Sequence, residues 1–194
     1  MHTATATDVA PVATALAKAF DDDPVMTYLF PDDASRPRRL SGLFSLLMRR
    51  HHLVHGEIWI EDGHPGAALW DPPDQWKLPA REQILSLPTL VRLMGRRTLI
   101  GLQSLGEAEK QHPKEPHWYL AVLGTQPAFQ GKGIGSALLG PVLERCDREG
   151  LPAYLESSKE QNIPFYRRHG FEVTGEIKLG KTGPTVWPMW RPPR

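Results

Sequence analysis

Three glycines alternate with other residues in Gln130-Gly131-Lys132-Gly133-Ile134-Gly135, between an apolar run and a segment with helical periodicity. Because glycine has no Cβ, a backbone rich in it can approach a ligand closely. The free amides of a helix's first turn point at such a ligand, and the helix dipole favours negative charge there. This turn is therefore a candidate site for phosphate or pyrophosphate.

Two common phosphate-binding patterns do not fit the turn. A Walker A loop requires Ser or Thr after its lysine, whereas Lys132 is followed by Gly133. The dinucleotide pattern G-x-G-x-x-G requires glycine where Ser136 stands. Glycine spacing alone is also compatible with a tight structural turn, so the neighbouring residues must decide.

The turn and a second segment resemble the GNAT acyltransferases. The family's cofactor motif, Q/R-x-x-G-x-G/A, is met by Gln130, Gly133 and Gly135, and residues 162–171 are similar to a block near the end of family members. A closer resemblance is to the puromycin N-acetyltransferase-like group. It is clearest in residues 113–116, 130–137, 154–158 and 162–171, and looser in the first half of the chain.

The resemblance implies direct attack of an amine on acetyl-CoA, the cosubstrate, with no metal. It places the pantetheine arm beside the end of the strand 118–125. The cofactor-binding residues that it implies are Leu123, Gly124, Thr125, Gln130, Gly131, Lys132, Gly133, Ile134, Gly135, Ser136 and Asn162. Two of these have structural alternatives, since Gly124 could serve packing and Asn162 could cap a helix.

Tyr166 matches the family's general acid, because a phenol with a pKa near 10 is protonated at neutral pH and can donate to sulfur. The alternative is a core tyrosine. The proton acceptor is less clear, because residues 118–125 contain no carboxylate. Glu156 on the next strand is the best candidate, directly or through water, although it could be a structural carboxylate. His117 is a further candidate, or simply polar surface.

The acceptor is expected to be a primary amine on a small, partly apolar molecule. Tyr28, Phe30 and Trp70 are the predicted substrate-binding residues, with core packing as the alternative for each. Acetylation of a protein N-terminus or lysine is a second possibility, which an open acidic groove would favour. A non-catalytic CoA-binding sensor is a third.

Three histidines, His51, His52 and His55, raise the question of a metal. No cysteine or carboxylate pattern in the sequence completes a ligand set around them. They are interpreted as the end of a helix, where imidazolium suits the dipole.

The elements that position these residues follow from periodicity and turn residues. Helices are expected over residues 7–20, 38–53, 81–105 (with interruptions near Pro88 and Gly95), 133–149 (kinked at Pro141) and 162–169. Strands are expected over 57–61, 67–70, 118–125 and 153–157, followed by a hairpin of 171–179 with 185–189. This order predicts an α/β or α+β fold whose sheet is covered by helices on both faces. The resemblance to the GNAT acyltransferases further implies the GNAT fold, with a mixed central sheet and a V-shaped splay between the two central strands.

Composition limits the remaining classes. The chain has 194 residues, which suits one domain spanning 1–194, and a net charge of +1 argues against a nucleic-acid partner. Its single cysteine, Cys146, lies in an apolar helical pattern and is expected to be buried. No apolar run is long enough for a membrane span, and the N-terminus lacks signal-peptide features. The expectation is a soluble cytoplasmic monomer or homodimer that acts on a small molecule.

Overall fold

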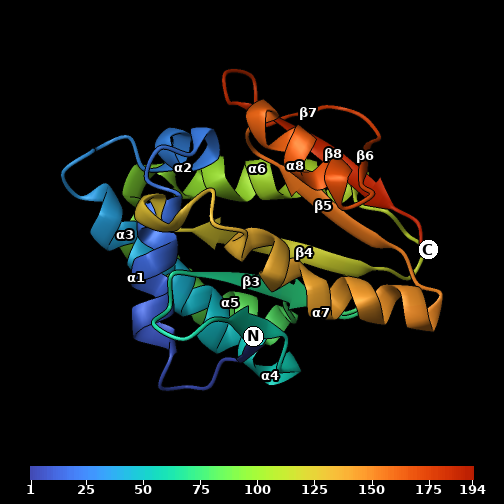
Figure 1. Ribbon diagram of the computed structural model, residues 1–194. Coiled ribbons are helices and arrows are strands. Elements are labelled where there is room, and N and C mark those ends of the chain that lie inside the picture. Colours follow the sequence, from blue (N-terminus) through green and yellow to red (C-terminus); the bar gives the residue numbers. More distant parts are fainter.

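A computed structural model describes all residues from 1 to 194 (Figure 1). The longer helices are α1 (Val9–Ala19), α3 (Arg36–Leu47), α5 (Ala80–Met94), α6 (Thr98–Gln111) and α7 (Ile134–Glu149), and the shorter ones are α2 (Pro24–Leu29), α4 (Leu53–His55) and α8 (Ile163–Arg168). The strands are β1 (His2–Thr3), β2 (Ile58–Ile60), β3 (Gly66–Asp71), β4 (Trp118–Thr125), β5 (Ala153–Ser157), β6 (Glu172–Val173), β7 (Ile177–Lys178) and β8 (Thr185–Arg191).

One mixed sheet runs through the molecule in the order β1-β2-β3-β4-β5-β8-β6, and β7 also pairs with β8. Only β4 and β5 are parallel, and every other pair is antiparallel. The parallel pair is joined through α7, as a parallel connection requires a crossover. The mixed sheet with helices on both faces confirms the predicted fold class.

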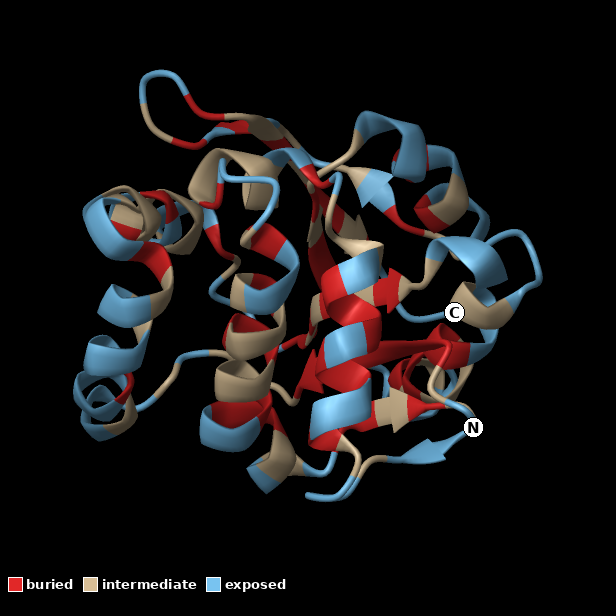
Figure 2. Cartoon of the chain, turned by 90° about the vertical axis from the view of Figure 1, so that its left-hand side faces the viewer, coloured by how far each residue is buried: buried red, intermediate tan, exposed pale blue.

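Two apolar cores lie on opposite faces of the sheet. Alternate residues of β3 enter different cores, with Ala67 and Leu69 in one and Ala68 and Trp70 in the other. Helices α1 and α3 cover the first face, and α7 and α8 cover the second. Figure 2 shows helices with buried residues turned toward the sheet and exposed residues turned outward. Burial on both faces explains why β3 has no polar alternation.

An irregularity in β4 opens the centre of the sheet. Leu69 of β3 pairs with Val122 and Trp70 pairs with Leu120, so Ala121 is an extra residue on β4. Such a bulge bends its strand. Beyond Leu120, β4 makes no further ladder pairs with β5, and Figure 1 shows the two strands separating toward the side of α1. This is the predicted V-shaped splay.

Several helix boundaries differ from those expected. The segment 38–53 is not one α-helix, because α3 gives way to a π-helical turn, η1 (Met48–His52). The region 81–105 is broken at Gly95 rather than Pro88, and α6 continues to Gln111. Helix α7 runs through Pro141 as one element and ends at Gly150, which adopts the left-handed conformation (φ 67°).

The single cysteine, Cys146, is fully buried in α7, as expected, and burial raises the pKa of its thiol to about 12.

None of the helices is both long and apolar enough to cross a bilayer.

Candidate active site

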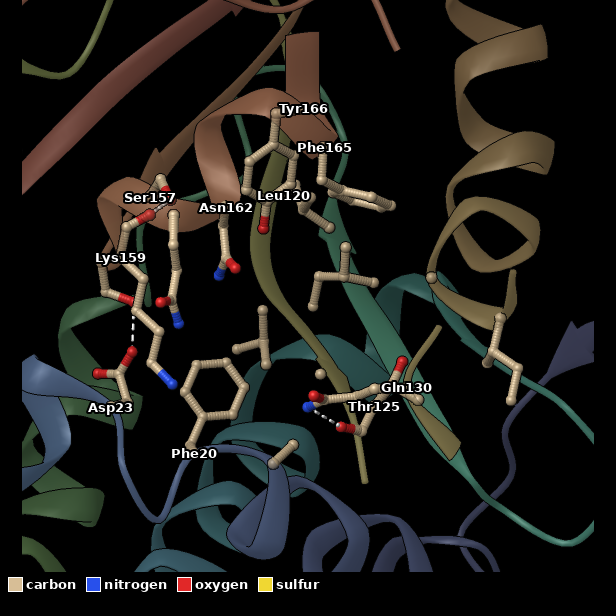
Figure 3. Close-up of a pocket in the computed structure, with 18 of the residues that line it drawn as sticks. Phe20, Asp23, Leu120, Thr125, Gln130, Ser157, Lys159, Asn162, Phe165 and Tyr166 are labelled. Atoms are coloured by element: carbon tan, nitrogen blue, oxygen red, sulfur yellow. Dashed lines mark hydrogen bonds between the residues drawn. The ribbon is translucent and has the colours of Figure 1, made fainter. Parts of the chain in front are cut away.

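A cavity of about 810 Å³ lies where β4 and β5 separate. Its walls come from the turn after α1, the second half of β4, the glycine turn, the end of β5 and the start of α8. Figure 3 shows side chains from these elements pointing into one space, with Tyr166 on one side and Gln130 and Thr125 on another. Segments from residue 18 to residue 168 thus meet at one site.

The cavity gathers nearly all the residues predicted for the cofactor. Those that line it are Leu123, Gly124, Thr125, Gln130, Gly131, Gly133, Ile134, Gly135, Ser136 and Asn162. Lys132 does not line it. Its Nζ donates to the carbonyl of Ala128 at 3.1 Å and lies 5.1 Å from the ring centre of Phe129. The glycine turn therefore presents its backbone to the cavity, and its lysine turns away.

The conformation of the turn explains its glycines. Gly131 and Gly133 have φ angles of 74° and 83°, a region that residues with side chains rarely adopt. A Cβ at either position would meet no protein atom within 4 Å, so the space in front of this backbone is open. Gln130 holds the start of the turn, because its Nε2 donates to the carbonyl of Thr125 at 3.1 Å. Gly133 is the N-cap of α7, so the free amides of that helix begin here. These features fit a pyrophosphate group.

The edge of β4 that faces β5 is also available to a ligand. Ladder pairing with β5 stops at Leu120, so the backbone of Leu123 to Thr125 has a strand partner only in β3. Backbone N–H and C=O groups that lack a strand partner are available to form hydrogen bonds with a ligand. An extended amide-containing chain, such as a pantetheine arm, fits this edge.

Gly124 proves to be a packing glycine, one of its two predicted roles. A Cβ there would lie 2.8 Å from Phe20, 2.9 Å from Leu16 and 3.0 Å from Ala19. Its lack of a side chain lets α1 approach β4 closely. The bulge in β4 lies three residues earlier, at Ala121.

Tyr166 reaches the cavity from α8. Its side chain is packed in the second core and only 8% of the residue is exposed, while Figure 3 shows its hydroxyl pointing into the cavity between Leu120 and Asn162. Burial, and the nearby carboxylate of Asp23, raise the pKa of this phenol well above its usual value. The group therefore stays protonated, as a proton donor must.

Glu156 reaches the cavity from β5 and is held by aromatic neighbours. The hydroxyl of Tyr119 donates to its Oε2 at 2.8 Å, and the Nδ1 of His112 lies 3.7 Å from its Oε1. Burial first, and the charge of Glu156 second, raise the pKa of the Tyr119 and Tyr154 phenols, so both stay protonated. Glu156 thus lines the cavity and also contacts Tyr119 and His112.

His117 is buried rather than polar surface, with 3% exposure. Its Nε2 lies 3.0 Å from Nε2 of His112, so it reaches Glu156 only through that ring. Burial lowers the pKa of His117. It does not line the cavity, and sequence reasoning missed His112 because it lies outside every motif.

Asp23 is a further cavity residue that sequence reasoning missed. It is 2% exposed, and its Oδ1 accepts from the amides of Val25 at 2.9 Å and Met26 at 3.1 Å. Ser158 donates to its other oxygen. Burial raises the pKa of this carboxyl. Asp21 and Asp22 also line the cavity, where Asp21 is paired with Arg36 at 3.3 Å and Asp22 with Lys159 at 2.6 Å.

The three residues predicted to bind the acceptor are not at the cavity. Phe30 and Trp70 are 1% and 0% exposed and belong to the two cores. Tyr28 lies beside Arg97, whose guanidinium is 5.5 Å from its ring centre, outside the cavity lining. Phe30 and Trp70 follow apolar stretches, and both fill the interior of the protein.

A carboxylate does lie beside two of the three histidines, so the expectation from the sequence that none would do so is wrong. Asp71, at the end of β3, places its Oδ1 2.8 Å from Nδ1 of His52 and 3.1 Å from Nε2 of His51. About twenty residues separate the aspartate from the histidines, and only the packing of η1 against β3 joins them.

A bulged strand that parts from a parallel neighbour beside a glycine turn is the arrangement that the sequence resemblance to the acyltransferases implied. The chain belongs to the acetyltransferase (GNAT) family, whose sequence profile matches residues 58–171. An uncharacterized N-acetyltransferase of Schizosaccharomyces pombe is 30% identical over 192 residues, which covers 93% of this chain and 77% of that protein.

Solved structures agree with this assignment. A crystal structure from Corynebacterium glutamicum, described as histone acetyltransferase HPA2 and related acetyltransferase, superposes with a TM-score of 0.76 at 31% identity, covering 99% of this chain and 94% of that one. Arylalkylamine N-acetyltransferase 2 of Aedes aegypti has a TM-score of 0.59 at 14% identity, covering 100% of this chain and 98% of that one, and shows a shared fold alone.

Proposed function

We propose that the protein transfers an acetyl group from acetyl-CoA to the primary amine of a small, partly apolar molecule. The observation that carries this proposal is the cavity, where the glycine turn, the free edge of β4, Tyr166 and Glu156 lie around one space. Acetyl-CoA would be held by the turn through its pyrophosphate and by β4 through its pantetheine arm, and it supplies the activated thioester.

The reaction needs two proton transfers, one from the amine and one to the departing sulfur, and Glu156 and Tyr166 serve one each. The amine must lose a proton before it can attack the thioester carbonyl, and Glu156 accepts that proton directly or through water. Tyr166 donates its proton to the departing sulfur. The new bond is between nitrogen and the acetyl carbon, and the broken bond is between that carbon and sulfur.

The cavity lining supports an acceptor of mixed character. Apolar side chains such as Phe20 and Phe165 share the wall with the aspartates and Lys159, and an aromatic body buried among them contributes about 1.5–3 kcal/mol. Puromycin is the first compound to try, because of the resemblance to the puromycin N-acetyltransferase-like group.

A panel of acceptors tests the substrate class. Aromatic amines, polyamines, aminoglycosides and lysine peptides are each incubated with acetyl-CoA, and the free thiol of CoA is measured. We expect turnover with aromatic primary amines. Turnover confined to peptides or aminoglycosides would overturn the partly apolar acceptor, and no thiol release with any class would favour a CoA-binding sensor.

Acetyl-CoA should raise the melting temperature of the protein. A ligand present at a hundred times its Kd stabilises the native state by about 2.7 kcal/mol, which for a chain of this size is a shift of about 5–10 °C. Differential scanning fluorimetry measures it, with ATP and NAD as comparison ligands that should shift it far less. No shift at millimolar acetyl-CoA would remove the cofactor from the proposal.

Replacing Glu156 with glutamine should lower kcat/KM about 10- to 50-fold at neutral pH, because the variant cannot accept the amine proton. The deficit should shrink as pH rises, since more amine is then already neutral. Glutamine keeps an oxygen that accepts from Tyr119, so the fold is preserved. Glu160→Gln, an exposed neighbour outside the cavity, is the matched control. A pH-independent deficit would mean that Glu156 is structural.

A further inference from the structure

A cluster of buried polar side chains lies between η1 and the end of β3, away from the cavity. It consists of His51, His52 and Asp71, which are 7%, 3% and 1% exposed. Their nearest polar atoms, Nε2 of His51, Nδ1 of His52 and Oδ1 of Asp71, all lie within 4.8 Å of one another. None of these residues lines the cavity, so the proposed reaction does not account for them.

The three atoms have no hydrogen-bond partner in the protein. Oδ1 of Asp71 lies 2.8 Å from Nδ1 of His52 and 3.1 Å from Nε2 of His51, within ion-pair distance of both rings, but neither contact has the geometry of a hydrogen bond. Buried polar groups in native proteins are nearly always satisfied, and each exception requires an explanation. A carboxylate is especially costly to bury without a compensating positive charge. Here that charge has to come from the two imidazoles, if they are protonated, or from a bound cation.

The backbone is adapted to bring the two histidines to one carboxylate. Adjacent residues of an α-helix point in directions about 100° apart, which separates neighbouring side chains. Here the helix widens into the π turn Met48–His52, which contains both histidines. Such turns are rare and occur frequently at functional sites. Both imidazole rings consequently lie next to the carboxylate of Asp71.

We propose that His51, His52 and Asp71 bind a divalent transition-metal ion of the zinc type. Two imidazole nitrogens and one carboxylate oxygen form a donor set that zinc and its neighbours in the first transition row accept. An ion between them would provide the missing partner for all three atoms and neutralise the buried aspartate. Zinc sites with three protein ligands complete their coordination with water. His55, whose ring centre is 5.1 Å from that of His51, lies beside the set without belonging to it.

The ion would have a structural role. It would tie η1, which continues α3, to the last residue of β3, and so join the helical layer to the sheet. Asp71 is opposite Tyr119 in the β3–β4 ladder, and Tyr119 in turn donates to Glu156. Metal binding would therefore stiffen the sheet next to the residues that hold Glu156, without contact with the acetyl group or the amine.

Metal binding to the whole chain tests the proposal without reference to activity. The protein is stripped with EDTA, and Zn²⁺ or Co²⁺ is then added. We expect one ion per chain, a visible Co²⁺ spectrum typical of nitrogen and oxygen ligands, and a melting temperature raised by about 5–10 °C when the ion is at a hundred times its Kd. Absence of binding and of any shift with Zn²⁺, Co²⁺ and Ni²⁺ at millimolar concentration would overturn the proposal.

Variants then locate the ion. Asp71→Asn and His52→Gln should each weaken binding at least about 100-fold, because even outer-shell changes cost 10- to 100-fold. His55→Gln, next to the cluster, is the control and should bind as the wild type does. Wild-type affinity in both ligand variants would place the ion elsewhere. If those variants do not fold, anomalous scattering from crystals of the Co²⁺-loaded wild type decides: a peak among the three side chains supports the site, and a peak elsewhere refutes it.

Discussion

Tyr166→Phe should lower kcat by about 10²- to 10³-fold and leave the affinity for acetyl-CoA nearly unchanged. The hydroxyl acts only when the thiolate leaves, so its loss removes stabilisation from the transition state and not from the bound ground state. Burial and the charge of Asp23 keep the phenol protonated over the working pH range. Phenylalanine fills the same space in the second core, so the free energy of unfolding should change little.

Steady-state kinetics and calorimetric titration with acetyl-CoA measure the two quantities. Tyr28→Phe is the matched control, because Tyr28 lies outside the cavity lining and loses the same hydroxyl. An unchanged kcat has two explanations, a packing role for Tyr166 or rate-limiting product release. A pre-steady-state burst distinguishes them, since a slow chemical step hidden by product release would appear as a smaller burst rate in the variant.

The strands, helices and cofactor turn of the second half of the chain could be predicted from the sequence, because the patterns that indicate them are local. Strand β4 alternates buried and intermediate residues throughout, and the glycine turn that follows it lines the cavity, as its spacing and neighbours indicated. The fold class was predictable for the same reason, since the order of strands and helices restricts the ways in which they can pack.

The acceptor side could not be read in this way, because its contacts join distant segments. Asp23 accepts from Ser158, 135 residues away in the chain, and nothing near Asp23 in the sequence indicates that it is buried at a cavity. Strand β3 is buried on both faces, so its sequence cannot tell which face Trp70 occupies. Similarly, the pairing of Asp71 with the histidines depends on how η1 packs on the sheet.

Gly133→Val should weaken acetyl-CoA binding more than about 100-fold, a loss of about 2.7 kcal/mol, while the protein stays folded. Gly133 has a φ of 83°, a conformation that a β-branched residue resists at a cost of about 1–2 kcal/mol. No protein atom lies within 4 Å of a Cβ placed there, so the new side chain would occupy the open space in front of the turn. That is the space proposed for the pyrophosphate. Gly135→Val is a less direct test, because its Cβ would lie 3.2 Å from the ring of Phe165.

The matched control for Gly133→Val lies at the other end of the same helix. Gly150 also has a positive φ, 67°, with no protein atom within 4 Å of a Cβ, but it is outside the cavity. Gly150→Val therefore imposes the same backbone strain without blocking the turn. Both variants should lose similar stability in thermal unfolding, and only Gly133→Val should lose acetyl-CoA in calorimetric titration. Equal losses of affinity would attribute the effect to strain transmitted through α7, and wild-type affinity in Gly133→Val would mean that the phosphates bind away from this turn.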